Sequence, residues 1–266
     1  MKVLVTGAAG NIGRVVTAGL TTRGHDVVGL DRRPVPDGWD GTWHTLDCAD
    51  PDAVGAAFAQ ERLDAVVHLA GYAGSSDLGT ALTSHTVTTA ALLDAMVEHD
   101  VRRIVYASSN HAVGLTPRHD VVDADTRPRP DSFYGVAKVA AETLLSLYAD
   151  RHGIDAIACR IGSFRERPET QRHLATWLSP DDCVRMVEAA LTAATPGFAI
   201  VYGISVNTRG WWDLAPGRAL GFEPQDDAES FATAIAGRPG DDEEAAYVGG
   251  SWATTALRPA FDRRAD

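Results

Sequence analysis

From residue 2 to residue 160, short apolar stretches alternate with longer segments that carry apolar residues on one face. The apolar stretches predict strands and the longer segments predict amphipathic helices. The predicted strands cover residues 2–6, 26–30, 65–69, 103–107 and 154–160, and the predicted helices cover residues 11–23, 133–151 and part of 78–99. Strands that alternate with helices in this way form a parallel sheet covered on both faces. We therefore expect an α/β fold with a doubly wound parallel sheet of the Rossmann type.

Beyond residue 160 the pattern is less regular. A polar loop is expected up to Gln171, and residues 238–245, rich in Gly, Pro and acidic side chains, are expected to form a solvated loop. Between them the pattern predicts helices at 180–193 and 228–236 and a strand at 198–202. This part is too short for an independent core. We expect a single domain of residues 1–266, with the Rossmann core at 1–160 and a small substrate-binding lobe at 161–266.

The charge balance narrows the choice of partners. With 24 basic and 36 acidic side chains, the formal net charge is −12 at pH 7, which repels phosphate backbones and anionic lipids. We expect a small-molecule partner and neither nucleic acid nor a membrane. Cys48, Cys159 and Cys183 are widely spaced and suit neither a disulfide framework nor a zinc site. No long apolar run or leader-like segment is present, so we expect a cytoplasmic protein.

A glycine-rich turn joins the first predicted strand to the first helix. Gly7, Gly10 and Gly13 have the G-x-x-G-x-x-G spacing. In dinucleotide-binding folds such glycines permit a tight turn, close approach of a pyrophosphate and close packing of helix on strand, while the helix amino terminus supplies amides and partial positive charge. The alternative interpretation is a plain turn between strand and helix.

An acidic residue follows where the cofactor requires one. Asp31 comes directly after the second predicted strand, 18 positions beyond Gly13. A carboxylate there accepts hydrogen bonds from a ribose diol and repels a 2′-phosphate, so NAD is favoured over NADP. A guanidinium of Arg32 or Arg33 beside that site would tolerate the phosphate, and the alternative, favoured more for Arg33 than for Arg32, is exposure to solvent.

Two further stretches are candidates for the walls of the cofactor channel. Asp47, with Cys48 beside it, follows a short predicted strand and is in position to reach the adenine. Leu69, Ala70 and Gly71 lie at the end of the strand predicted at 65–69. In both stretches the alternative is an ordinary loop.

Tyr134 and Lys138 stand four residues apart in a predicted helix and share one face. Only Lys2 and Lys138 are lysines among 24 basic residues, and a compact ammonium reaches a ribose hydroxyl and a phenol in a way that a guanidinium does not. A free phenol has a pKa near 10, and lowering it by two to three units requires about 3–4 kcal/mol. We expect Lys138 and a positively charged nicotinamide to supply that stabilisation.

Polar residues follow the strand predicted at 103–107, at the edge where open α/β sheets bind ligands. Ser109 is the expected third member of the catalytic group, hydrogen-bonded to the substrate hydroxyl while Tyr134 removes its proton. The alternative for Ser108 and Ser109 is a turn that ends the strand. His111 has no paired ligands at a spacing that suits a metal, and its alternative is a packed loop histidine.

With these motifs in order, the chain resembles the extended short-chain dehydrogenases over nearly its whole length. Residues 107–111, 160–163, 176–179 with 181–182, and 210–213 are similar to the corresponding segments of uronate dehydrogenases. The resemblance implies oxidation of a hexuronate, such as glucuronate or galacturonate, at C1 to an aldarolactone with NAD as acceptor.

The resemblance also implies roles for individual residues, with Tyr134 as the base and Lys138 as its electrostatic partner and ribose ligand. Cofactor contacts are implied at Ile161 and at the backbone of Asn11 and Ile12, and substrate contacts at Ser109, Asn110, His111, Ser163 and Arg172. The chain departs from the family between Tyr72 and Ser76. The position aligned with a substrate serine of the family is Ala73, and Ser75 replaces that serine if the loop is shifted.

A physical argument independently favours Arg172 as a substrate ligand. A uronate carries a carboxylate at C6, and a guanidinium binds a carboxylate with two parallel hydrogen bonds. The alternative is a surface ion pair with Glu169. Trp211 and Trp212 are candidates for a wall of the sugar site, although packing of the lobe is the alternative use of at least one.

Two other functions share parts of this pattern. A nucleotide-sugar epimerase or dehydratase has the same fold, cofactor and Tyr/Lys pair, but only 128 residues follow Lys138 and the segment 160–163 lacks the Arg-Pro sequence of those enzymes. A non-catalytic dinucleotide-sensing protein typically lacks the Tyr or the Lys, and both are present here. A homo-oligomer that pairs the helices of 78–99 and 133–151 is possible from the sequence.

Overall fold

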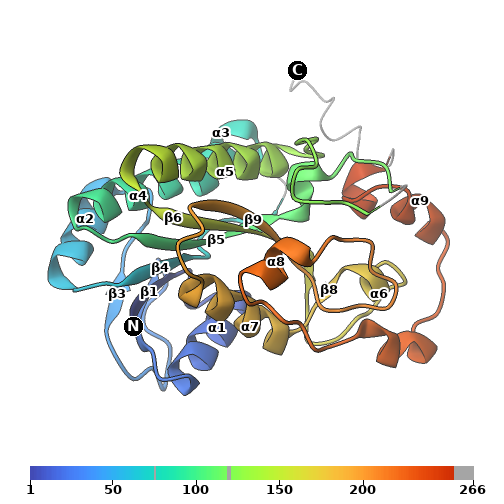
Figure 1. Cartoon of the computed structure of the whole chain (residues 1–266), viewed down its shortest axis with the longest axis horizontal. Helices are drawn as coiled ribbons and strands as arrows, with labels where there is room; N and C mark the ends of the chain where they lie inside the picture. Colours follow the sequence, from blue (N-terminus) through green and yellow to red (C-terminus); the bar gives the residue numbers. More distant parts are fainter. Residues whose placement is uncertain (75, 119–120, 255–266) are drawn as a thin grey trace.

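A seven-stranded parallel sheet forms the centre of the computed structural model, which describes residues 1–74, 76–118 and 121–254 (Figure 1). The strands run in the order β3-β2-β1-β4-β5-β6-β9, and every neighbouring pair is parallel. Their bounds are β1 (Lys2–Thr6), β2 (Asp26–Asp31), β3 (Trp43–Thr45), β4 (Ala65–His68), β5 (Arg103–Ser109), β6 (Asp155–Ile161) and β9 (Phe198–Gly203). The expected doubly wound Rossmann fold is confirmed.

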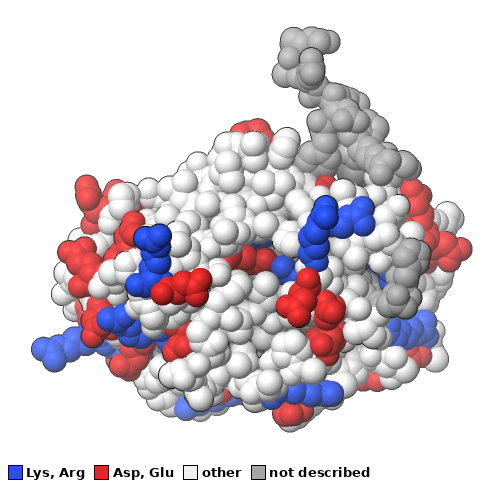
Figure 2. Space-filling view, turned by 45° about the horizontal axis from the view of Figure 1, so that its top comes forward, with Lys and Arg blue, Asp and Glu red and all other residues white. Residues whose placement is uncertain are grey.

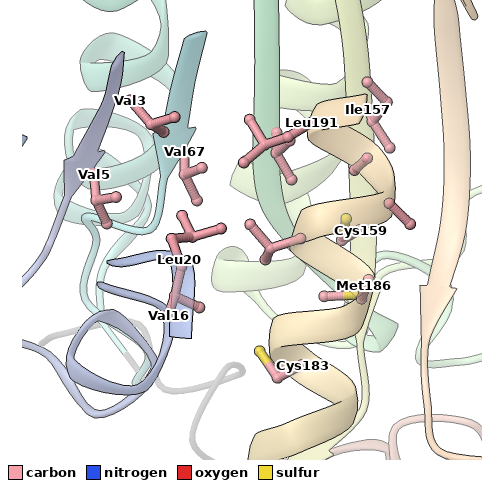
Figure 3. Close-up of a cluster of buried hydrophobic side chains, with 14 of the residues drawn as sticks. Val3, Val5, Val16, Leu20, Val67, Ile157, Cys159, Cys183, Met186 and Leu191 are labelled. Atoms are coloured by element: carbon pink, nitrogen blue, oxygen red, sulfur yellow. The ribbon is translucent and has the colours of Figure 1, made fainter. Parts of the chain in front are cut away.

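Helices cover both faces of this sheet (Figure 1). On one face lie α1 (Asn11–Thr22) and α7 (Pro180–Thr192), and on the other α2 (Pro51–Gln60), α4 (Thr88–Glu98) and α5 (Phe133–His152). Side chains alternate along β1, so that Val3 and Val5 pack with α1 and α7 while Leu4 packs with the helices opposite. Figure 3 shows the apolar core that includes Val3 and Val5 and the buried side chains of α1 and α7. Burial on both faces explains the continuous apolar strands of the sequence.

The helix expected within residues 78–99 contains a wider turn. It comprises α3 (Leu78–Leu82), a π-helical turn at Thr83–Val87, and α4. The π turn contacts the loop that follows β4, because the Tyr72 amide donates to Ser84 Oγ at 2.7 Å and His85 Nε2 lies 3.0 Å from the Tyr72 carbonyl oxygen. Such turns are frequent at functional sites.

Three segments differ from the expectations. Helix α2 was not predicted, although Asp50 caps it and Pro51 begins it in the usual way. Residues 228–236 were expected to form an α-helix, but Ala228–Ala234 form 3-10 turns, with the Asp227 side chain accepting from the Glu229 amide. The expected solvated loop at 238–245 contains α9 (Asp241–Ala245), whose acidic first turn suits a helix amino terminus.

The remaining elements lie beyond the carboxyl ends of β6 and β9 (Figure 1). They are β7 (Ser163–Phe164), β8 (Trp177–Leu178), α6 (His173–Thr176), α8 (Ala215–Ala219), α9, and 3-10 turns at Asn110–Val113 and Gly250–Ala253. Helix α7 and strand β9 also follow residue 160, yet they complete the main sheet and its helical cover, because β9 pairs with β6. A substrate-binding lobe, which stays a prediction, would therefore consist of the other segments. Within the described residues, no helix is long and apolar enough to cross a membrane.

A buried ion pair fixes α5 on the sheet. Arg160, 2% exposed, reaches Glu142 through two hydrogen bonds, Nε to Oε1 at 3.0 Å and Nη2 to Oε2 at 2.9 Å. Ser108 at the end of β5 donates to the same carboxylate at 2.5 Å, and Arg160 Nη1 donates to the Tyr202 hydroxyl of β9 at 3.4 Å. One carboxylate thus ties α5 to β5 and β6 directly, and to β9 through Arg160.

We expect Glu142→Leu to destabilise the protein by about 3–5 kcal/mol, because it leaves the Arg160 guanidinium buried without its counterion. The free energy of unfolding from urea denaturation measures the loss. The double variant Glu142→Leu with Arg160→Met removes both charges and should recover most of the stability. A double variant as unstable as the single one would show that the unpaired charge is not the cause.

Candidate active site

The glycine-rich turn lies at the carboxyl ends of β1 and β4, where the strand order reverses. Gly7 has φ +68°, and a Cβ there would lie 2.7 Å from the Ala70 nitrogen. A Cβ at Gly13 would lie 2.1 Å from the Gly7 carbonyl oxygen. Both positions therefore require glycine. Crevices at this switch point bind ligands in doubly wound sheets.

The surroundings of this turn fit a dinucleotide. Helix α1 begins after Gly10 with no side-chain cap and no acidic residue in its first turn, which leaves backbone amides for a pyrophosphate. Beside it, the apolar side chains of Ile12, Leu69 and Ala107 are only partly buried and pack against the core that contains Ile161.

Asp31 ends β2 and is only 8% exposed. Its carboxylate accepts from the Ala9 amide at 3.1 Å and from the Arg33 amide at 3.0 Å. Burial opposes ionisation, but the hydrogen bonds from Arg33 and Ala9 outweigh it and lower the pKa of Asp31. Both arginines are exposed, as was favoured for Arg33, but Arg33 rather than Arg32 contacts the Asp31 carboxylate. Arg33 folds back onto Asp31, with Nε at 3.3 Å, whereas Arg32 is highly exposed and lies 3.7 Å from Asp47.

The other predicted cofactor residues lie at the same edge of the sheet. Asp47 is exposed and accepts from the Ala49 amide at 2.9 Å. Burial raises the pKa of Cys48 to about 12, so its thiol stays protonated. The Ala70 amide donates to Thr6 Oγ1 at 3.2 Å, and Gly71 has φ +151°, with the His85 ring 2.5 Å from the position of a Cβ.

The structure brings Ser109, Tyr134 and Lys138 together. Ser109 at the end of β5 lies near enough to the Tyr134 hydroxyl to act on its pKa as a hydrogen-bonding neighbour, and its Oγ donates to Asn110 Oδ1 at 3.3 Å. Lys138 Nζ donates to the Ala107 carbonyl oxygen at 2.5 Å and lies 5.5 Å from the centre of the Tyr134 ring. Ser108, the neighbour of Ser109, is instead bound to Glu142, so only one of the two serines faces the phenol.

Burial dominates the ionisation of this group. It raises the pKa of Tyr134 to about 12, although the hydrogen bond from Ser109 acts in the opposite direction. It also lowers the pKa of Lys138 to about 7, against the attraction of Glu142. Without a cofactor, burial disfavours both charged forms; that Lys138 and a positively charged nicotinamide together lower the pKa of the phenol stays a prediction.

Three rings surround Tyr134, and two of them were not predicted. The ring centre of His111 lies 5.8 Å away, that of His85 5.0 Å and that of Trp252 6.0 Å. Asp131 orients His111 through a 2.7 Å contact between its Oδ2 and Nδ1, while Trp252 packs on the other side at 4.5 Å. Trp252 has no regular pattern around it in the sequence. An acidic residue three positions before Tyr134 was the only available signal for Asp131.

Arg172 precedes α6 and points towards Ser163. Its Nη1 donates to Ser163 Oγ at 3.4 Å and to Thr176 Oγ1 at 3.3 Å, and its Nη2 donates to the Val248 carbonyl oxygen at 2.5 Å. Among the described residues no carboxylate lies within 4 Å of it, and Nε is buried without a partner. Burial lowers its pKa to about 10.

The ion pair considered as an alternative for Arg172 is not formed. Glu169 instead pairs with Arg165 at 2.9 Å. The Val248 carbonyl also accepts from Asn110 Nδ2 at 3.4 Å, so Asn110 and Arg172 donate to the same oxygen.

Trp211 and Trp212, the candidates for a wall of the sugar site, lie in an aromatic cluster with Tyr202. Trp212 is 7% exposed and packs on Tyr202 with ring centres 4.7 Å apart, and Trp211 stacks on Trp212 at 4.0 Å. Their contacts with each other and with Tyr202 support the packing interpretation. Ser75 lies outside the described residues. No group of three metal-ligating side chains occurs in the part of the chain that the structure describes.

Comparisons with known proteins agree with this geometry. A model of the NAD dependent epimerase/dehydratase family matches residues 3–179. The chain is 34% identical over 255 residues to a uronate dehydrogenase of Pseudomonas putida, with 95% of each chain covered. It is 35% identical over 252 residues to an NAD-dependent glucose-6-phosphate dehydrogenase of Haloferax volcanii, covering 86% of this chain and 95% of the relative.

The structural comparison gives the same result. The crystal structure of uronate dehydrogenase from Agrobacterium tumefaciens matches with a TM-score of 0.88 at 35% identity, covering 95% of this chain and 96% of that chain. A fold, a cofactor turn and a Tyr/Lys pair of this kind, together with these matches, show that the chain belongs to the NAD dependent epimerase/dehydratase family and, within it, to the uronate dehydrogenases.

Proposed function

We propose that this enzyme oxidises a hexuronate, such as glucuronate or galacturonate, at C1 to the aldarolactone with NAD. The observation that carries the proposal is Arg172, a guanidinium whose Nε is buried without a partner and which lies beside Ser163 with no carboxylate within 4 Å among the described residues. A buried cation without a counterion is costly, and an anionic substrate would supply that counterion.

Tyr134 removes the proton of the C1 hydroxyl, while Ser109 holds that hydroxyl and the phenol in one hydrogen-bonded group. The C1–H bond breaks as the carbonyl forms, and with the ring oxygen attached this carbonyl is a lactone. The chemistry that NAD would supply, when bound, is a hydride acceptor and a positive charge close to the phenol. Lys138 is held by Ala107 at the height of the Tyr134 ring, where a ribose hydroxyl and the phenol are both within its reach.

The remaining side chains orient the sugar. Arg172 binds the C6 carboxylate through two hydrogen bonds, and Ser163 lies next to it. Asn110 donates to the same carbonyl oxygen as Arg172, and Asp131 holds His111 in place. Asn11, Ile12, Asp31 and Ile161 contact the cofactor in this proposal.

We expect Tyr134→Phe to lower turnover by roughly 10²–10⁴-fold, because it removes the proton acceptor and keeps the ring. NAD affinity should remain close to that of the wild type. Initial rates of NADH formation and a binding titration with NAD measure the two effects. Tyr148→Phe, on the same helix but bound to Asp94, is the matched control and should retain activity.

The pH dependence of the wild type tests the same role. Since burial raises the pKa of Tyr134 and the ionised phenol is the base, oxidation should become faster from about pH 6 to 9. The assignment of Tyr134 as the base would be contradicted by an oxidation rate that does not change with pH while the chemical step limits the rate. It would also be contradicted by a Tyr134→Phe variant that retains activity.

The second expectation concerns the cofactor. Asp31→Ala should narrow the preference for NAD over NADP on the order of tenfold, mainly by improved use of NADP, because it removes the repelling carboxylate and frees Arg33 for the 2′-phosphate. The ratio of kcat/KM for the two cofactors measures the change. Arg32→Ala, which alters an exposed neighbour, should leave the ratio almost unchanged. A wild type that prefers NADP would refute the role of Asp31.

The third expectation concerns the substrate. Arg172→Ala should reduce kcat/KM for uronates by about thirty-fold or more and affect neutral glucose much less, since the lost contact is to a carboxylate. Arg172→Lys should recover only part of the lost kcat/KM for uronates, because an ammonium cannot form two parallel hydrogen bonds with a carboxylate. Glucuronate, galacturonate, glucose and glucose 6-phosphate are compared in one buffer.

Arg165→Ala is the control, since Arg165 is exposed and already paired with Glu169. A wild type that prefers glucose or its phosphate would exclude the uronate as substrate. An unchanged ratio of uronate to glucose in Arg172→Ala would place the carboxylate elsewhere, with Arg165 and Arg167 as the next candidates.

A further inference from the structure

A large cavity adjoins Arg172 on the side of α9. Its volume is about 690 Å³, within the range of pockets that hold ligands larger than a monosaccharide. We call it the arginine cavity, and its lining residues are Arg118, Gln171, Arg172, Ala175, Arg209, Gly237, Arg238, Pro239, Gly240, Asp241, Asp242 and Ala245. Four arginines on one cavity are notable in a chain of net charge −12. Figure 2 shows how basic side chains are otherwise scattered among acidic ones on one face of the molecule.

Two of the four guanidinium groups already have carboxylate partners. Arg209 binds both oxygens of Glu229 at 2.7 and 2.8 Å. Arg238 binds Asp241 at 3.1 Å, which also neutralises one of the two acidic residues of the lining. These pairs stabilise the wall and contribute little free positive charge.

The other two, Arg118 and Arg172, form no ion pair with any of the residues that the structure describes. Arg118 is nevertheless held in place, because its amide donates to the Ala246 carbonyl oxygen at 2.9 Å and its guanidinium lies 5.3 Å from the ring centre of Trp211. Partial burial lowers its pKa. The cavity thus presents a positioned guanidinium that has no ion-pair partner within residues 1–74, 76–118 and 121–254.

Arg172 connects this cavity to the reaction site. Its side chain lines the cavity, while its Nη1 lies 3.4 Å from Ser163 Oγ. In a pyranose ring C1 and C4 are on opposite sides, and C4 is next to C5, which bears the carboxylate. With C1 at Tyr134 and the carboxylate at Arg172, O4 is directed away from Tyr134 and past Arg172.

From this arrangement we propose that the arginine cavity binds a second acidic sugar unit, attached to O4 of the uronate that is oxidised, and that Arg118 binds its carboxylate. The inference rests on the proposed function, and it extends the substrate class to 4-linked di-uronides with a free reducing end. Oxidation at C1 leaves the O4 linkage intact, so the hydride and proton transfers are those of the monosaccharide.

The test compares galacturonate with a disaccharide of two 4-linked galacturonate units, with NAD in excess and NADH absorbance as the signal. The wild type should oxidise the disaccharide with kcat/KM at least comparable to that for galacturonate. Arg118→Gln should lower the disaccharide value by about tenfold and leave the galacturonate value almost unchanged. Arg118→Lys should lower kcat/KM for the disaccharide less than Arg118→Gln does, because the positive charge remains.

Arg218→Gln is the matched control, since it removes the same charge from an exposed arginine that does not line the cavity. It should change neither value. If the wild type oxidises galacturonate but not the disaccharide, or if Arg118→Gln affects both substrates equally, the inference is wrong and the proposed function stands. If neither uronate is oxidised, the proposed function itself fails.

Discussion

The position of α5 on the sheet is the constraint on which the rest of the site depends. The Glu142 carboxylate, 4% exposed, fixes that position through Arg160 of β6 and Ser108 of β5. Glu142 lies one turn beyond Lys138 and two turns beyond Tyr134, so the same anchor sets the height of both side chains at the carboxyl end of the sheet. Ser108 donates to the Glu142 carboxylate, and this contact fixes the end of β5, where Ser109 follows, relative to α5.

Burial sets the electrostatic state of the catalytic group as well as its geometry. It raises the pKa of Tyr134 and lowers those of Lys138 and Arg172. All three shifts favour the uncharged forms, so the charged form of each group is stabilised when a ligand brings the opposite charge close to it. An anionic sugar beside Arg172 and a cationic ring beside Tyr134 would both act in this direction.

Local patterns were enough to predict most of the fold and to single out candidate site residues. Alternating apolar and amphipathic segments gave the bounds of six of the seven strands that form the main sheet of the described chain, and the seventh was expected only as a short strand before Asp47. Spacing alone pointed to Gly7, Gly10, Gly13 and the Tyr134–Lys138 pair. The contacts that could not be predicted join residues far apart in sequence, such as Arg172 with the Val248 carbonyl or Trp252 with His111. Periodicity and motif spacing describe residues close together in the sequence, so they do not predict such contacts. They also do not predict how deeply a side chain is buried, and burial is what shifts the pKa values.

The charge of the whole chain and the charge of the site act in opposite directions. At a net charge of −12, long-range attraction does not bring an acidic sugar to the enzyme, and counter-ions screen charges beyond about 10 Å. In the proposed function, recognition of the acidic sugar therefore depends on guanidinium groups at contact distance, held by neutral partners. Arg172 is held by two hydroxyls and a carbonyl, and Arg118 by its own backbone and a Trp211 ring. Such partners orient a cation without neutralising it, which leaves its full charge for the ligand.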